Sequence, residues 1–326
     1  MINSIDEIFL VKVRLRSYRA LTPNRLLHLV NSKISSLAEL LTVLHGLDVV
    51  SCLQSEFKVG EQLPLDLTYR KLVDCWVSDL RKLTALLKPS NQVIDFIEAY
   101  VSKYLAYELI VFLAEGYGYR TVFLPEEVRN AVVQSNYVYE VLDKVSRGGK
   151  QLPTLVLEFL TRYRRKSLKD LDRYLLLREY VEFLYDRLTK IFQDLRVESY
   201  VLECLNKMKN VSLYKDDVRE AFIKKKALKG FTSFSRRERM SLEKAMISND
   251  PHLLEEVLMS LPIFSCDRSL RTSPLSYAYL LHFLTLKDWE SFILSNIVYL
   301  INLGYEPESI RESFKGWLEA YDVIYS

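Results

Sequence analysis

Apolar residues recur along most of the chain at the three- and four-residue spacing that places them on one face of a helix. Residues 69–87 show this most clearly, since Leu72, Trp76, Leu80 and Leu83 share a face. Segments of this kind follow one another with short polar breaks, and only 9 glycines and 9 prolines interrupt the 326 residues. The pattern predicts an all-α protein.

Residues 274–314 carry the clearest signals for where helices begin and end. They predict a helix, a short break over 285–288, a second helix that ends at Gly304, and a third that begins at Pro307. Asp288 suits a helix N-cap because its carboxylate can accept an unpaired backbone N–H of the first turn. Gly304 suits the left-handed residue that ends a helix.

Polar residues mark the starts of other helices. Ser35 or Ser36 is the expected cap of a helix that begins at residue 37, and Asn249 or Asp250, followed by Pro251, is the expected cap of a later helix. Residues 236–247 are expected to form the helix before that cap.

One short motif occurs three times in the chain. Acidic residues precede a β-branched apolar residue and an arginine in segments 126–129, 216–219 and 308–311. Each copy is expected to form the first turn of a helix, where acidic side chains are favoured. The copies lie roughly 90 residues apart, and a fixed period of this size is typical of repeated architecture.

The period predicts three similar helical domains. They are residues 1–146, which include an N-terminal extension, residues 147–232 and residues 233–326. The stretches 146–153 and 230–235 are the expected boundaries because they contain glycines and other turn-forming residues.

Residues 9–16 alternate apolar and basic side chains, a pattern that usually indicates a strand. No second strand is predicted for this segment to pair with, so we expect the start of a helix or an extended arm. Either structure would carry Lys12, Arg14, Arg16 and Arg19, which lie close together in the sequence.

Positive and negative charges nearly cancel over the whole chain, with Lys+Arg 45 against Asp+Glu 42 and a net charge of +3. No overall field attracts a polyanion, so a nucleic acid is not expected as a partner. Two local basic clusters stand out at 162–166 and 224–226. We interpret both as solvated helix faces, although such clusters can also bind phosphate groups or an acidic protein.

The four cysteines, Cys52, Cys75, Cys204 and Cys266, are far apart and form no Cys-x-x-Cys pair. They are predicted to be reduced core residues, without a disulfide framework or a zinc site. No apolar run reaches the roughly 18 to 20 residues that a membrane span needs, and the acidic start of the chain does not resemble a secretory signal. A soluble, intracellular chain is the expectation.

The sequence offers no recognisable catalytic constellation. None of its four histidines lies in the His-Glu-x-x-His pairing that binds zinc, and His282 falls in an apolar helical segment where a core histidine is expected. No P-loop or Gly-x-Gly-x-x-Gly motif provides a backbone cradle for phosphates. We therefore predict no catalytic, cofactor-binding or metal-binding residue, no cofactor and no small-molecule substrate.

Several segments nevertheless resemble a known family. Residues 274–281 (PLSYAYLL), 287–290 (KDWE) and 303–310 (LGYEPESI), together with the alternating segment 9–16, are similar to the C-type rotor protein of the archaeal-type (A/V-type) rotary ATPase. This rotor protein is the counterpart of the d-type component of eukaryotic vacuolar ATPases. The resemblance covers the whole chain by the order and spacing of its helices, and the final segment by recognisable motif.

The resemblance implies three similar helical domains in a funnel with pseudo-threefold symmetry. It also implies a component of the central rotor without catalytic activity of its own, which links the central stalk to the proteolipid ring in the membrane. Torque would pass through it for ATP synthesis or for proton and ion transport. The chain would then lie peripherally on the cytoplasmic side of the membrane, with the stalk proteins and the ring as partners. Lys12, Arg14, Arg16 and Arg19 are the hypothesised contacts.

Two other interpretations stay open. A helical-repeat adaptor would bind another protein in a concave face. A helical enzyme would bind phosphorylated substrates through the cluster at 162–166, although the sequence shows no general base or metal site for it.

Overall fold

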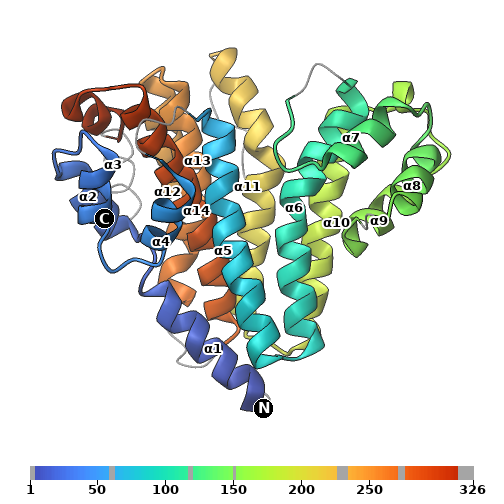
Figure 1. Ribbon diagram of the computed structural model, residues 1–326, viewed down its shortest axis with the longest axis horizontal. Helices are drawn as coiled ribbons and strands as arrows, with labels where there is room; N and C mark the ends of the chain where they lie inside the picture. Colours follow the sequence, from blue (N-terminus) through green and yellow to red (C-terminus); the bar gives the residue numbers. More distant parts are fainter. Residues whose placement is uncertain are drawn as a thin grey trace. The chain divides into compact units, whose positions relative to one another are not determined.

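The computed structural model describes residues 4–58, 63–116, 120–149, 152–225, 234–270 and 276–314, with the side chains of 264, 265 and 267–270 left out. This part of the chain is helical and contains no strand, which confirms the all-α prediction (Figure 1).

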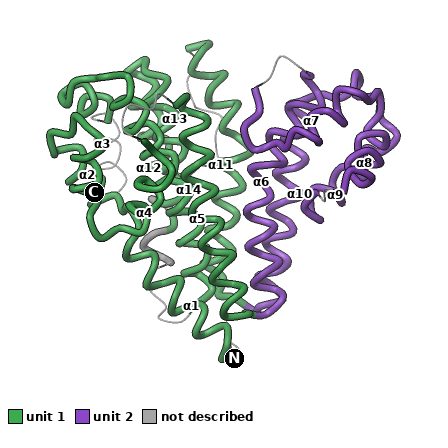
Figure 2. The backbone as a smooth tube through the Cα atoms, in the orientation of Figure 1, with its two compact units in different colours: residues 1–89, 197–326 green, residues 90–196 purple. Residues whose placement is uncertain are grey.

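The helices form two compact units (Figure 2). Unit 1 combines residues 1–89 with 197–326, and unit 2 consists of residues 90–196. The boundary expected at 146–153 lies within unit 2, and most of the other expected boundary, at 230–235, lies outside the described residues. The division into three similar domains stays a prediction.

Unit 1 is built around the 25-residue helix α14 (Ala278–Asn302), which packs against α1, α5 and α13. Trp289 of α14 is fully buried, and its indole N–H donates to Ser260 Oγ at 2.7 Å. The other helices of unit 1 are α1 (Ser4–Ser17), α2 (Pro23–Asn31), α3 (Leu37–Val43), α4 (Val49–Glu56), α5 (Leu65–Leu87), α11 (Ser199–Ile223), α12 (Arg236–Ile247) and α13 (Pro251–Leu270).

The break expected at 285–288 is wrong, because α14 continues through it without interruption. Thr285 donates its hydroxyl to the carbonyl of Leu281 within the helix, and Lys287 and Asp288 are buried. The polar residues that suggested a cap are therefore part of the buried interior of unit 1. The end of α14 is as expected, since Gly304 has a φ of +74° and a further helix begins at Pro307.

The three copies of the acidic motif differ in their structure. Glu126 and the residues after Pro307 lie in first helical turns as predicted, with Val128 and Ile310 buried. The middle copy is wrong, because residues 216–219 lie inside α11. There the Arg219 guanidinium donates to Asp216 and to Glu255 of α13, so the acidic and basic residues connect two helices instead of starting one.

Residues 9–16 lie inside α1, which confirms the helical alternative for this segment. Phe9, Leu10 and Val13 are buried, and α1 packs against α14 and α5. The phenol of Tyr277 donates to the buried Asp6 carboxylate at 2.9 Å, and burial together with Asp6 raises the pKa of Tyr277. The start of α1 is thereby attached to the segment that leads into α14.

Unit 2 is centred on a pair of long helices, α6 (Asn91–Glu115) and α10 (Arg173–Asp194). Phe96 and Phe192 stack between them with ring centroids 3.9 Å apart. The buried Glu108 carboxylate of α6 accepts the backbone N–H groups of three consecutive residues, 122–124, and so fixes the chain before α7. The shorter elements are α7 (Glu126–Val133), α8 (Val138–Arg147), α9 (Thr154–Thr161) and the 3₁₀ helix η2 (Leu168–Asp170).

The prediction of reduced cysteines is wrong for two of the four. Cys52 of α4 and Cys75 of α5 form a disulfide, because the hairpin of these helices brings their Cα atoms to 6.0 Å. Cys204 and Cys266 are buried free thiols, as predicted. The separation of the two cysteines along the chain did not predict the disulfide, since it does not indicate that α4 packs against α5.

Removal of the disulfide in a Cys52→Ala/Cys75→Ala variant is expected to lower the free energy of unfolding by about 3 kcal/mol, the chain-entropy value for a loop of this size. The sequence separation that sets this value is 23. Denaturant unfolding with and without a reductant measures it. The reductant should destabilise the unchanged protein by a similar amount and leave the variant unaffected. An unchanged protein that ignores the reductant would contradict the prediction.

Glu256 of α13 predicts a pH dependence of stability. Its side chain is 4% exposed, and its Oε2 has no hydrogen-bond partner among the described residues. Burial, with a smaller contribution from the Asp250 charge, raises the pKa of Glu256 well above its usual value. As pH rises past the normal glutamate pKa, the unfolded chain releases this proton while the folded chain keeps it, so stability falls.

The Glu256→Gln variant cannot release that proton and is expected to be about 2 kcal/mol more stable than the unchanged protein at neutral pH. The two proteins should converge in stability near pH ~4, the normal glutamate pKa, which denaturant unfolding across the pH range would show. Parallel pH profiles for the two proteins would exclude a protonated Glu256.

Candidate functional site

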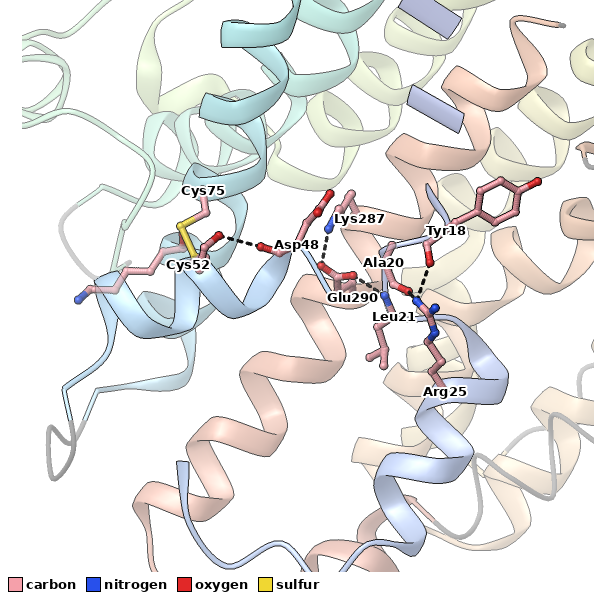
Figure 3. A network of polar contacts seen from close by, with 11 residues as sticks. Tyr18, Ala20, Leu21, Arg25, Asp48, Cys52, Cys75, Lys287 and Glu290 are labelled. Carbon is pink, nitrogen blue, oxygen red and sulfur yellow. Dashed lines mark hydrogen bonds and ion pairs between the residues drawn. A yellow bond between two sulfur atoms is a disulfide. The ribbon is translucent and has the colours of Figure 1, made fainter. Parts of the chain in front are cut away.

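A buried ion pair lies where the start of the chain meets α14. Lys287 Nζ and Glu290 Oε1 are 2.7 Å apart, and their side chains are only 4% and 3% exposed (Figure 3). The other carboxylate oxygen, Oε2, accepts the backbone N–H of Leu21 at 2.6 Å. Glu290 therefore joins two segments that are 269 residues apart in the sequence.

The turn after α1 is held by further polar contacts. The Arg25 guanidinium donates to the carbonyls of Tyr18 and Ala20 at 2.7 and 2.9 Å (Figure 3). Asp48, at the start of α4, donates its backbone N–H to the Arg19 carbonyl at 3.0 Å and places its carboxylate 3.8 Å from the Arg19 guanidinium. Both ends of this turn are thus tied to helices of unit 1.

A small cavity lies beside this network, with about 20 Å³ available to a water-sized molecule. Its charged lining consists of Arg16 and Lys287 together with Asp48, Asp79 and Glu290, and the Cys52–Cys75 disulfide forms part of its wall. The space suits a single water bound by polar groups. Among the residues that the structure describes, no group of three His, Cys, Asp or Glu side chains is placed to hold a metal ion.

The structure separates the four predicted contact residues, Lys12, Arg14, Arg16 and Arg19. Lys12 and Arg19 are exposed, whereas Arg16 is half-buried at the cavity. Arg14 packs its guanidinium over the ring of Tyr279 and donates to the Tyr18 hydroxyl, and that hydrogen bond raises the pKa of Arg14. Arg14 therefore has structural contacts inside unit 1, and Arg16 lines the cavity. Lys12 and Arg19 are exposed to a partner, with the Arg19 guanidinium also 3.8 Å from the Asp48 carboxylate.

The surface around Lys12 and Arg19 also has an apolar part, which the alternating sequence pattern does not indicate. Five large apolar side chains of α1 and the following turn are between 41% and 56% exposed: Ile5, Ile8, Val11, Leu15 and Tyr18. Their spacing of three and four residues places them on one side of the helix, on the same side as Lys12. We call these five residues, with Lys12 and Arg19, the α1 face.

The α1 face could have been found from helical spacing. Once residues 9–16 are placed on a helix, Phe9, Leu10 and Val13 fall on the inner side and Ile8, Leu15 and Lys12 on the outer side. The alternation of apolar and basic residues suggested a strand, in which successive side chains point to opposite faces. On that basis the inner and outer sides of the helix could not be recognised.

The other residues singled out in the sequence are a histidine and two basic clusters. His282 is buried within α14, as expected for a core histidine. The basic cluster at 162–166 is mostly exposed in unit 2, and Lys224 and Lys225 are exposed after α11, whereas Lys226 lies outside the described residues. No helix in the described part of the chain has the length and apolar character needed to cross a bilayer.

No protein-family model matches the chain, and no curated protein sequence matches it. The chemical capacity of the site therefore has to be judged from its geometry. A rigidly held helix with an exposed apolar stripe and neighbouring cations can bind a partner surface that is apolar and acidic.

The buried pair predicts a large coupling between Lys287 and Glu290. Lys287→Met leaves a buried carboxylate without its cation and is expected to cost about 3–5 kcal/mol of stability. Adding Glu290→Gln to that variant should recover part of the loss, because the amide oxygen can still accept from Leu21 and neither residue of the pair then carries a charge. Urea unfolding of the two single variants and the double variant measures this cycle.

The exposed pair of Lys224 and Glu220 is the matched control, with side chains 51% and 58% exposed. Lys224→Met should cost less than about 1 kcal/mol, because water screens an exposed ion pair. Additive losses at Lys287 and Glu290, as for two independent sites, would contradict the buried coupling.

Proposed function

We propose that the protein is a non-catalytic central-rotor component of an A/V-type ATP synthase or ATPase. In this role it is a socket that links the central stalk to the membrane proteolipid ring and transmits torque for ATP synthesis or for proton or ion transport. The proposal places it peripherally on the cytoplasmic side of the membrane. It draws on the resemblance of residues 274–281, 287–290 and 303–310 to the C-type rotor protein of such complexes.

The α1 face is the observation that carries the proposal. A part that passes torque must bind its neighbours through a surface that does not yield, and close-packed helices transmit strain with little compliance. The inner side of α1 packs against α14 and α5, and its first residues are fixed by the Asp6 bond to Tyr277. The exposed side chains thus stand on a helix that is anchored along its length.

The chemistry of the α1 face supports a protein partner with an apolar and acidic contact surface. The apolar side chains supply contact area, and the cations Lys12 and Arg19 select a partner with carboxylates at its rim. Either the ring or the foot of the stalk would have to present such a surface.

A helical adaptor that binds one other protein is the second candidate function. The α1 face supports it equally, because an exposed apolar stripe with basic neighbours also suits an amphipathic helix of an unrelated partner. The two functions differ in how many different partners bind at once.

The Ile8→Ser/Leu15→Ser variant is expected to reduce co-purification of the ring and stalk proteins about tenfold or more, since central apolar residues contribute most to the binding energy of an interface. Quantitative mass spectrometry of complexes captured through a tag on the full-length chain measures this. Lys12→Glu should weaken capture more strongly at low salt than at high salt.

Ile223→Ser/Ile247→Ser is the matched control, because both residues are apolar and highly exposed, at 77% and 84%, in the last turns of α11 and α12 of unit 1. It should leave co-purification unchanged. Equal capture by all variants, or equal loss in the control, would show that the α1 face is not the binding surface. Unfolding curves should coincide for the variants, which separates lost binding from lost folding.

A further inference from the structure

Unit 2 carries a second exposed surface that the proposed rotor role does not use. We call it the basic–tyrosine surface, and its residues are Arg162, Arg164, Arg165, Lys166 and Lys169 with Tyr137 and Tyr139. The sequence indicates only the basic cluster, because the tyrosines belong to a separate segment at the start of α8, before α9.

Backbone hydrogen bonds bring the tyrosines next to the cations. Tyr139 donates its N–H to the Arg164 carbonyl at 3.1 Å, and Val138 donates to the Lys166 carbonyl at 3.2 Å. In the other direction, Leu168 donates to the Asn136 carbonyl at 2.8 Å. Because residues 136–139 and 164–168 are paired in this way, the surface has a fixed arrangement.

The cations of this surface are available to a ligand. Arg164, Arg165, Lys166 and Lys169 are exposed, and within the described part of the chain none of them forms an ion pair. Arg162 packs its guanidinium over the ring of Phe183 at 4.2 Å, so it contributes charge from a fixed position.

Three carboxylates lie on or beside these segments, Glu140, Asp143 and Asp170, so five positive charges face three negative ones. Glu140 accepts the N–H of Asn136 at 2.7 Å and the hydroxyl of Tyr139 at 3.2 Å. The backbone hydrogen bond from Asn136 lowers the pKa of Glu140, which keeps it ionised and engaged. The surface therefore keeps an excess of positive charge for a ligand.

The tyrosines distinguish between possible anionic ligands. Tyr137 and Tyr139 are 42% and 39% exposed, and their rings stack on each other at 5.7 Å with an interplanar angle of 27°. The ring faces that meet are covered, so at most the outer face of each ring remains for a stacked base. Tyrosine side chains have an apolar ring and a polar hydroxyl, and they are enriched where a membrane meets water. Two tyrosines beside cations therefore fit the headgroup region of a bilayer.

We infer that the basic–tyrosine surface binds the headgroups of anionic phospholipids at the surface of a membrane. The cations contact the phosphate groups, and the tyrosine rings lie among the headgroups without any segment crossing the bilayer. The inference rests on the proposed function for its membrane, since that function places the protein at the bilayer that holds the ring. The contact would add a lipid anchorage to the protein contacts of the α1 face.

Vesicle flotation with the purified full-length protein tests the inference without ring or stalk. The protein should float with phosphatidylcholine vesicles that contain about one third phosphatidylglycerol, and it should not float with phosphatidylcholine alone. Added salt should weaken the binding. Arg164→Gln/Arg165→Gln should lower the partition coefficient about 30-fold, since each basic residue near an anionic bilayer contributes a factor of about five.

Arg187→Gln/Lys190→Gln is the matched control, because both residues are exposed on α10 of the same unit and the change in net charge is equal. It should leave partitioning unchanged. Equal loss in both variants, or no binding to anionic vesicles, overturns the inference. A single-stranded oligonucleotide bound more tightly than the vesicles, or release of the vesicles by millimolar inorganic phosphate, also overturns it.

These outcomes are independent of the proposed rotor role. Flotation without capture of ring and stalk would support the lipid contact while the rotor role fails. Capture of ring and stalk without flotation would leave the rotor role in place and remove the lipid contact.

Discussion

The buried ion pair of Lys287 and Glu290 is the interaction on which the arrangement of unit 1 depends. Two charges removed from water cost several kcal/mol each, so the pair is tolerated only where each charge finds its partner in good geometry. That geometry exists when α14 is continuous and when the Leu21 amide reaches the second oxygen of Glu290. The long helix α14 is thereby given one position against the turn that follows α1.

This requirement explains why α1 can present an apolar surface to solvent. The turn after α1 is held by the contacts of Leu21, Arg25 and Asp48. The first turn of α1 is held by the hydrogen bond between Asp6 and Tyr277. The helix therefore cannot rotate to bury Ile8 and Leu15. An apolar stripe that stays exposed is costly unless it has a partner. The same contacts that order the interior therefore produce the surface on which the proposed coupling function depends.

Local signals in the sequence predict much of the fold. Residues 236–247 form α12 as expected, Ser36 and Asp250 cap their helices, and Gly304 has the left-handed conformation of a helix end. The misses share a physical cause, because each depends on contacts between distant segments. The continuity of α14, the disulfide from Cys52 to Cys75 and the interior position of residues 216–219 could not be read from neighbouring residues alone. Of the four predicted contact residues, Lys12 and Arg19 are exposed, whereas Arg14 packs on Tyr279 and Arg16 lines the cavity, and their role in binding stays a prediction.

The central claim is that one copy of the chain joins two different partners in a rotary complex. Native mass spectrometry of the complex captured from membranes through a tag on the chain tests it most directly. The account predicts one copy of the chain bound at the same time to a proteolipid ring and to soluble stalk proteins. Capture of the chain alone, of several copies, or of a single soluble partner would contradict it.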